Sequence, residues 1–205
     1  MKRAAIAIMF LLASFPVFAQ IYVGAAIAHV AAQESHDNPT LYLGYAFSKY
    51  LAAEVGYIGN GLLAERSLGQ SNTPLGGNVF RMESTMEREE AEWLRATARL
   101  TLPINEHVSL FGTISAYRVE VENTNVFQTA DVLVIGNNTT MLSGSSTTTV
   151  KNSTETVPGF GFGGKVHMGE SFSLTAGVER VNLKDGMVRD TDHVQITTIG
   201  AEWRF

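Results

Sequence analysis

Seven charged side chains occupy the polar face of segments in which apolar and polar residues alternate. They are Glu54, Arg95, Arg99, Lys165, Glu179, Glu202 and Arg204. If these faces line one narrow interior, the charges must pair with one another, because an unpaired buried charge is costly. The favoured interpretation is a salt-bridged plug that holds the interior closed. The alternative is a narrow conduction path that opens when ion pairs exchange partners.

Catalytic or metal-binding chemistry finds little support in the sequence. A hydrolase needs a nucleophile beside a base, and the nearest such pair, His167 and Ser171, flanks a predicted turn. The remaining histidines lie near predicted turns and connections, without an evident serine and orienting acid, at His29, His36, His107 and His193. There is no cysteine and no metal-ligand spacing of histidines. We therefore predict no catalytic residue, no cofactor and no metal, and hence a non-enzymatic protein.

The composition excludes other classes. The 205 residues suffice for one domain, and the formal net charge of −5 offers no basic patch for nucleic acid. Residues 1–19 begin with Lys2 and Arg3, continue with an apolar run and end in Val17-Phe18-Ala19. This pattern predicts a cleaved signal peptide, because the apolar run is shorter than the roughly 20 residues of a spanning helix. The other segments are also too short for such a helix.

The elements that must position the charges are strands. Period-two alternation recurs along residues 20–205; for example, Ile199, Ala201, Trp203 and Phe205 alternate with polar or small residues. The alternation predicts eight strands, at approximately 21–30, 40–47, 51–58, 93–102, 108–119, 157–168, 172–181 and 194–205. Each is long enough to cross a bilayer as a tilted strand.

The predicted connections alternate between short and long. Three are tight, whereas long loops are expected near 59–92 and 120–156. Short turns on one rim and long loops on the other are typical of an outer-membrane barrel, with the long loops extracellular. A lipocalin-like soluble barrel is the alternative. Sparse charges on the polar faces and aromatic residues near the strand ends favour the membrane form. The fold class is therefore all-β, an eight-stranded antiparallel up-and-down transmembrane barrel.

Two segments resemble a known family. Residues 199–205 look like the C-terminal strand of bacterial outer-membrane proteins, and residues 21–26 resemble the opening strand of the OmpA-like barrels, which include OmpX and opacity-type adhesins. The resemblance implies the outer membrane of a Gram-negative bacterium, with Trp203 and Phe205 as an assembly signal. The implied partners are membrane lipid, lipopolysaccharide, the barrel assembly machinery and host surface molecules. No nucleic acid is expected.

The function predicted from these observations is a non-enzymatic outer-membrane protein that supports envelope integrity and presents loops at the cell surface. A surface adhesin and a narrow porin-like channel are the alternatives. The acidic stretch 82–92 is best explained as a solvated strand extension, with divalent cations or lipopolysaccharide as other possible contacts. The polar stretch 137–156 is expected to be a flexible or hairpin-extended loop, or an adhesive one.

Overall fold

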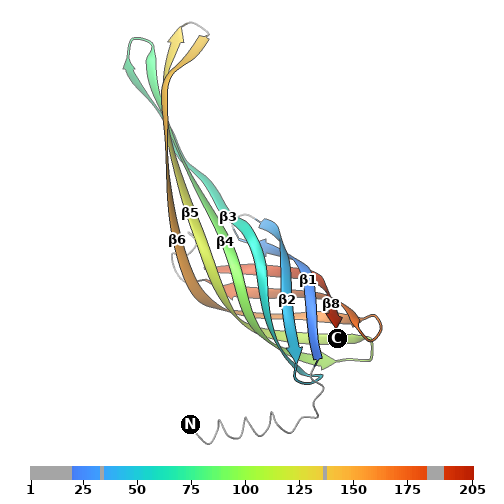
Figure 1. The fold of residues 1–205 in the computed structure, drawn as a ribbon. Coiled ribbons are helices and arrows are strands. Elements are labelled where there is room, and N and C mark those ends of the chain that lie inside the picture. Colours follow the sequence, from blue (N-terminus) through green and yellow to red (C-terminus); the bar gives the residue numbers. More distant parts are fainter. Residues whose placement is uncertain (1–19, 33–34, 136–137, 184–191) are drawn as a thin grey trace, which may run out of the picture.

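The computed structural model describes residues 20–32, 35–135, 138–183 and 192–205. The predicted signal peptide lies outside these residues, as do parts of three of the predicted connections. The described residues form eight antiparallel strands in a closed ring (Figure 1). The strands are β1 (Gln20–Ala31), β2 (Ser35–Ala46), β3 (Leu51–Gly76), β4 (Val79–Pro103), β5 (Val108–Ile135), β6 (Asn138–His167), β7 (Phe172–Asn182) and β8 (His193–Arg204).

Each strand pairs with its neighbours in the chain, and β1 closes the ring on β8, from Tyr22 opposite Arg204 to Ala31 opposite Gln195. The predicted fold class is therefore confirmed. The apolar residues of each alternating segment point outward, as at Ile199, which is 68% exposed, and Leu100, which is 60% exposed. The described residues include no helix that is long and apolar enough to cross a membrane.

Three tight turns join strands at one end of the barrel, which we call the turn end. In the first, Ser48 Oγ accepts hydrogen bonds from the backbone N–H groups of Tyr50 and Leu51, both at 3.2 Å. In the second, Asn105 Oδ1 accepts from the N–H groups of His107 and Val108. The third contains Gly169 with a φ of 85°, a left-handed conformation that glycine adopts without strain. Local polar side chains and one glycine thus set these turns.

The four strands β3 to β6 continue far beyond the barrel as one antiparallel sheet (Figure 1). We call residues 59–76, 79–92, 120–135 and 138–156 the extension. The segments 59–92 and 120–156, predicted to be loops, are thus mostly β-strand. Alternation of apolar and polar residues reveals a strand only when its two faces differ in environment. Much of the extension is exposed on both faces, so its strands carry no such contrast.

Among the described residues, two strand edges of the extension have no neighbour in the sheet. The pairing of β3 with β2 ends at Ile58, opposite Thr40, and the pairing of β6 with β7 ends at Gly159, opposite Val181. The β4 part of the extension, 79–92, reaches roughly 45 Å at the usual rise of about 3.3 Å per residue. The barrel wall thus carries a long sheet that projects away from the turn end (Figure 1).

Candidate functional site in the barrel interior

Six of the seven predicted interior charges lie buried inside the barrel. Each comes from the inward-facing positions of its strand, and the strands involved are β3, β4, β6, β7 and β8. The exposed fractions are 3% for Glu54, 8% for Arg95, 4% for Arg99, 5% for Lys165, 7% for Glu179 and 1% for Glu202. Side chains from five strands therefore converge in an interior that is narrow in any eight-stranded barrel.

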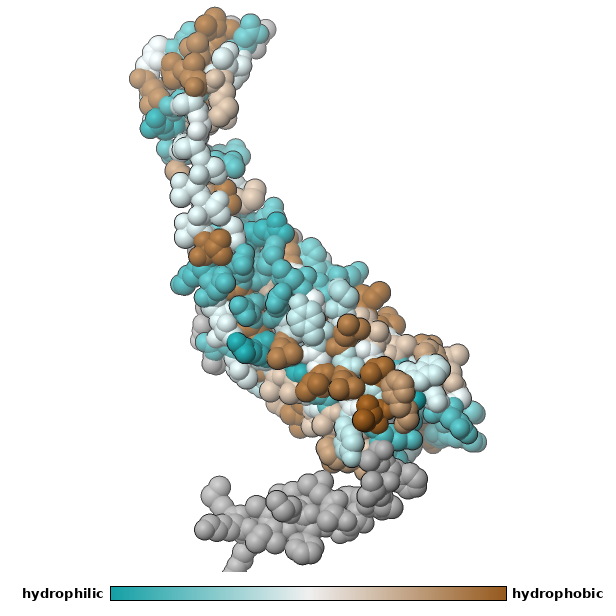
Figure 2. All heavy atoms as spheres, viewed as in Figure 1, coloured by the Kyte–Doolittle hydropathy of each residue, from teal (hydrophilic) through white to brown (hydrophobic). Residues whose placement is uncertain are grey.

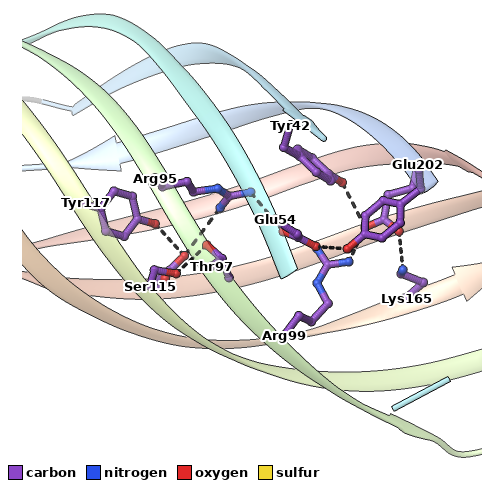
Figure 3. A network of polar contacts seen from close by, with 11 residues as sticks. Tyr42, Glu54, Arg95, Thr97, Arg99, Ser115, Tyr117, Lys165 and Glu202 are labelled. Atoms are coloured by element: carbon purple, nitrogen blue, oxygen red, sulfur yellow. Dashed lines mark hydrogen bonds and ion pairs between the residues drawn. The ribbon is translucent and has the colours of Figure 1, made fainter. Parts of the chain in front are cut away.

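These six side chains form one chain of alternating charge (Figure 3). Lys165 Nζ contacts Glu202, whose Oε1 also lies 2.5 Å from Arg99 Nη1. Arg99 Nη2 then reaches Glu54 Oε1 at 2.8 Å. Arg95 links the remaining carboxylates, with nitrogen–oxygen distances of 3.8 Å to Glu54 and 3.7 Å to Glu179. Three cations thus balance three carboxylates, which is the condition for burying charge at tolerable cost. We call this group the ion chain.

Three tyrosine hydroxyls complete the ion chain, one for each carboxylate. Tyr22 donates to Glu54 at 2.5 Å, Tyr42 donates to Glu202 at 3.1 Å, and Tyr117 donates to Glu179 at 2.7 Å. They were not predicted from the sequence, because the prediction rested only on the charged side chains of the polar faces. Their inward position in the alternation was the available signal.

Glycines make room for two of these rings. Tyr22 lies opposite Gly44, and Gly24 lies opposite Tyr42, on the paired strands β1 and β2. A Cβ atom at Gly44 would lie 2.1 Å from Cζ of Tyr22, and one at Gly24 would lie 2.0 Å from Cζ of Tyr42. Both distances are far below van der Waals contact. The two glycines are therefore required for the tyrosines to lie flat across the interior.

An apolar cluster fills the interior on the extension side of the ion chain. Trp93, Val119, Val181 and Val194 are each 0% exposed, and they pack with further aliphatic residues from most of the strands. The rings of Trp93 and Tyr117 meet edge to face, with centroids 5.9 Å apart. The predicted interior was polar, so this cluster is a difference from expectation. It closes the interior with close-packed side chains rather than with charge.

The turn end of the interior is open instead. A cavity of about 850 Å³ lies there, lined in part by Tyr22, Arg99, Lys165, His167 and Arg204. Arg204, the seventh predicted interior charge, is not part of the ion chain: its Nη2 lies 3.4 Å from His167 Nδ1. The interior thus has three levels, namely an open cavity, the ion chain and the apolar cluster.

The histidine with the best access to a nucleophile is His167. Its Nε2 lies 3.1 Å from Ser109 Oγ, and its Nδ1 lies 3.0 Å from Ser173 Oγ. The sequence singled out Ser171 rather than these two serines. A catalytic triad requires a carboxylate on the second nitrogen, but here Ser173 and the guanidinium of Arg204 occupy that side. His29 instead pairs with Asp37, at 2.8 Å.

The acidic stretch 82–92 shows no arrangement of a metal site among the described residues. Within the part of the chain that the structure describes, no group of three or more His, Asp or Glu side chains is arranged to hold a metal ion. Glu90 instead contacts Arg88, at 2.5 Å, and accepts a hydrogen bond from Asn60 Nδ2, at 3.0 Å. This stretch is part of β4, in agreement with the interpretation as a strand extension.

The two aromatic residues of the predicted assembly signal lie on the outer wall, where β8 meets the turn end. Trp203 is 51% exposed and Phe205 is 74% exposed. The ring of Trp203 lies beside that of Phe172, with centroids 6.2 Å apart, and the backbone N–H of Phe205 donates to the carbonyl of Ile21 at 3.0 Å. Both side chains are therefore accessible from outside the barrel.

Comparisons with known proteins agree with this architecture. A family model described as OmpA-like transmembrane domain matches residues 17–167. The fold is similar to a major outer-membrane protein of Thermus thermophilus, with a TM-score of 0.54 and 11% identity, over 91% of this chain and 99% of that chain. It is also similar to Ail, the attachment invasion locus protein of Yersinia pestis, with a TM-score of 0.48, 16% identity, and coverage of 91% and 97%. No curated protein sequence matches.

Proposed function

Because this chain belongs to the family of OmpA-like transmembrane domains, we propose that it is a non-enzymatic protein that supports envelope integrity and holds its extension at the cell surface. Membership makes it a β-barrel protein of the Gram-negative outer membrane, and the family resemblance predicted from residues 21–26 and 199–205 is confirmed. The finer role is the proposal developed below.

The extension is the observation that carries the proposal. In outer-membrane barrels, short turns face the periplasm and long connections face outward. The three tight turns lie at one end of this barrel, and β3 to β6 project from the other (Figure 1). We therefore propose that the extension lies outside the cell, on a rigid base. Exposed segments on rigid scaffolds are where proteins commonly carry recognition.

The closed interior supports the envelope role. The centre of the barrel holds a balanced ion chain and a close-packed apolar cluster. Such a barrel spans the membrane without forming an open pore. We expect cells that lack the protein to become more sensitive to detergent, and the full chain to restore resistance. Unchanged sensitivity would remove the envelope role and leave surface presentation.

Surface labelling tests the orientation directly, because the chain contains no cysteine. Thr147 is exposed in the extension, and Glu106 is exposed in a tight turn. In intact cells, a membrane-impermeant maleimide should label Thr147→Cys but not Glu106→Cys, and permeabilising the outer membrane should expose both. The reverse pattern would overturn the proposed orientation. Retention of the boiling-dependent gel shift typical of folded barrels serves as the control for folding.

Adhesion to host surface molecules is the second candidate function. It is favoured by the two free strand edges of the extension, which offer unpaired backbone groups to a partner. Deleting Gln128 to Glu155 removes the β6 edge and should then reduce binding to host cells, while leaving the barrel in the membrane. Undiminished binding by that variant would remove adhesion through this hairpin.

We also propose that the C-terminal strand is recognised by the barrel assembly machinery. The exposed side chains of Trp203 and Phe205 support this, because another protein can contact them from outside the barrel. The variant Phe205→Ala should insert slowly in cells yet refold normally into detergent micelles. Equal slowing in both settings would indicate a folding defect instead. Lipopolysaccharide is the proposed neighbour of the outer wall, where the extension leaves the lipid.

A further inference from the structure

The far end of the extension is apolar, although most of the surface beneath it is polar (Figure 2). Nine apolar residues gather there: Leu75, Val79, Phe80, Val132, Leu133, Val134, Ile135, Met141 and Leu142. We call them the crown. Several are strongly exposed, with fractions of 60% at Ile135, 65% at Met141 and 54% at Leu142. Contiguous exposed apolar surface usually marks an interaction site.

Two leucines of the crown are displayed by β-bulges. Pro74 pairs with Phe80 and Gly76 with Val79, which leaves Leu75 as an extra residue without a cross-strand partner. Likewise, Asp131 pairs with Ser143 and Val132 with Met141, which leaves Leu142 unpaired. A bulge re-aims a side chain and is commonly found at sites with a function. The same device thus presents a leucine on each outer strand of the sheet.

The crown carries no uncompensated charge. Within residues 72–82 and 131–143, the charged residues are Arg81 and Asp131. They bind each other through two contacts, of 2.8 and 3.2 Å, and Ser143 Oγ donates to Asp131 at 3.1 Å. The arginine holds the pKa of Asp131 below its usual value. The crown therefore has no net charge, because the opposite charges of Arg81 and Asp131 at its base balance each other.

The occupant of this surface must contact both faces of the hairpins. Leu133, Val134 and Ile135 are consecutive strand residues, so their side chains alternate between the two faces. A folded protein docking on the sheet would cover one face and leave the other in water. A lipid phase surrounds an inserted hairpin on all sides. The barrel, which the protein's own bilayer would surround, lies at the other end of the molecule from the crown (Figure 1).

We propose that the crown inserts into the interface of a second lipid bilayer that faces the bacterium, and that this bilayer is zwitterionic. The absence of net charge on the crown favours neutral headgroups over anionic ones. Insertion is shallow, because the edges of β3 and β6, which have no strand partner among the described residues, cannot enter the hydrocarbon core without a large penalty. The proposal rests on the surface orientation of the extension.

A fluorescence experiment tests the proposal on the full barrel in lipid nanodiscs. We would attach an environment-sensitive nitrobenzoxadiazole probe to Leu142→Cys, and as a matched control to Leu68→Cys. Leu68 is also left unpaired at a bulge, between Ser67 and Gly69, and is 48% exposed, but it lies well below the crown. Phosphatidylcholine vesicles that contain brominated lipid are then added.

We expect the probe at position 142 to shift to the blue and to be quenched by the added vesicles, while the probe at 68 stays unchanged. The unlabelled double variant Leu75→Ser/Leu142→Ser should bind these vesicles more weakly, by about tenfold for each leucine removed. Binding should not depend on salt, and added phosphatidylglycerol should not strengthen it, because no net charge takes part.

Three outcomes would overturn the proposal. Equal responses at 68 and 142 would indicate nonspecific adsorption of the extension. A response at 142 that grows with protein concentration in detergent micelles, where no bilayer is present, would identify a second copy of the chain as the occupant. No response at either position would exclude a phosphatidylcholine surface. Because the experiment uses nanodiscs, its failure does not bear on the surface orientation, which the cysteine labelling of intact cells tests separately.

Discussion

Replacing Glu202 with glutamine is the sharpest test of the ion chain. Glu202 is 1% exposed and contacts Lys165, Arg99 and the hydroxyl of Tyr42. The substitution preserves shape but leaves three buried cations against two carboxylates. Arg99 keeps Glu54, at 2.8 Å, whereas Lys165 loses the carboxylate that it contacts.

The expected cost is about 3–5 kcal/mol of unfolding free energy, the usual result of removing one partner from a buried ion pair. The assay is urea unfolding of the barrel in lipid vesicles, followed by tryptophan fluorescence and by the boiling-dependent gel shift. The matched control is Glu106→Gln, because Glu106 is exposed in a tight turn and should change stability by less than about 0.5 kcal/mol.

A second substitution separates charge balance from simple loss of contacts. Adding Lys165→Met to Glu202→Gln removes the stranded cation and leaves Arg95 and Arg99 against Glu54 and Glu179. If unbalanced charge is the cause, the double variant is more stable than Glu202→Gln alone. A double variant that is less stable than either single one, or an unchanged unfolding midpoint for Glu202→Gln, would refute the reasoning.

Three further predictions follow from the same geometry. Gly44→Ala should cost about 1–3 kcal/mol of unfolding free energy, because its Cβ would lie 2.1 Å from the ring of Tyr22. The control is Gly112→Ala, which should be tolerated because the nearest atom to its Cβ would be 3.9 Å away. Urea unfolding of the two variants compares their stabilities. The lowered pKa of Asp131 means that its contact with Arg81 stabilises the extension above pH of about 4 and is lost as the pH falls below that value. Limited proteolysis against pH should show that the extension is cleaved more readily in acid, and Asp131→Asn should reduce this pH dependence at the tip. In planar bilayers the protein should give no sustained single-channel current, and steady conductance would favour the channel function.

Alternation was enough to predict the barrel, because each wall strand separates lipid from interior. The segment 93–102 illustrates this: Leu94 and Leu100 face outward, whereas Arg95 and Arg99 are buried. The same rule failed for 138–156, a strand that is mostly exposed on both sides. Its serines and threonines are compatible with a strand or with a loop, and only the register of β6 on β5 distinguishes the two.

The charged residues of the candidate site could be selected from the sequence, but the tyrosines that join them and the position of Arg204 could not. The inward positions of the alternation include Glu54 and Glu202, which are buried in the interior. They also include Arg204, which lies near the end of β8 and lines the open cavity. Tyr22 and Tyr42 also occupy inward positions of the alternation, but tyrosine is equally common at a membrane interface. Which of two environments an amphipathic side chain occupies depends on tertiary packing.

The continuity of four strands gives the filled part of the barrel interior a second role. Glu54, Arg95 and Arg99 lie on β3 and β4, the same strands that leave the membrane and form the extension. Trp93 and Val119 lie where β4 and β5 pass from barrel to extension, and both are 0% exposed. A hollow barrel would let these strands shift against one another, and a small shift at the base would be magnified along the roughly 45 Å of sheet above it. The ion chain and the apolar cluster fix β3 to β6 in register where they diverge from the other strands. The interior is therefore best understood as the anchor of the extension.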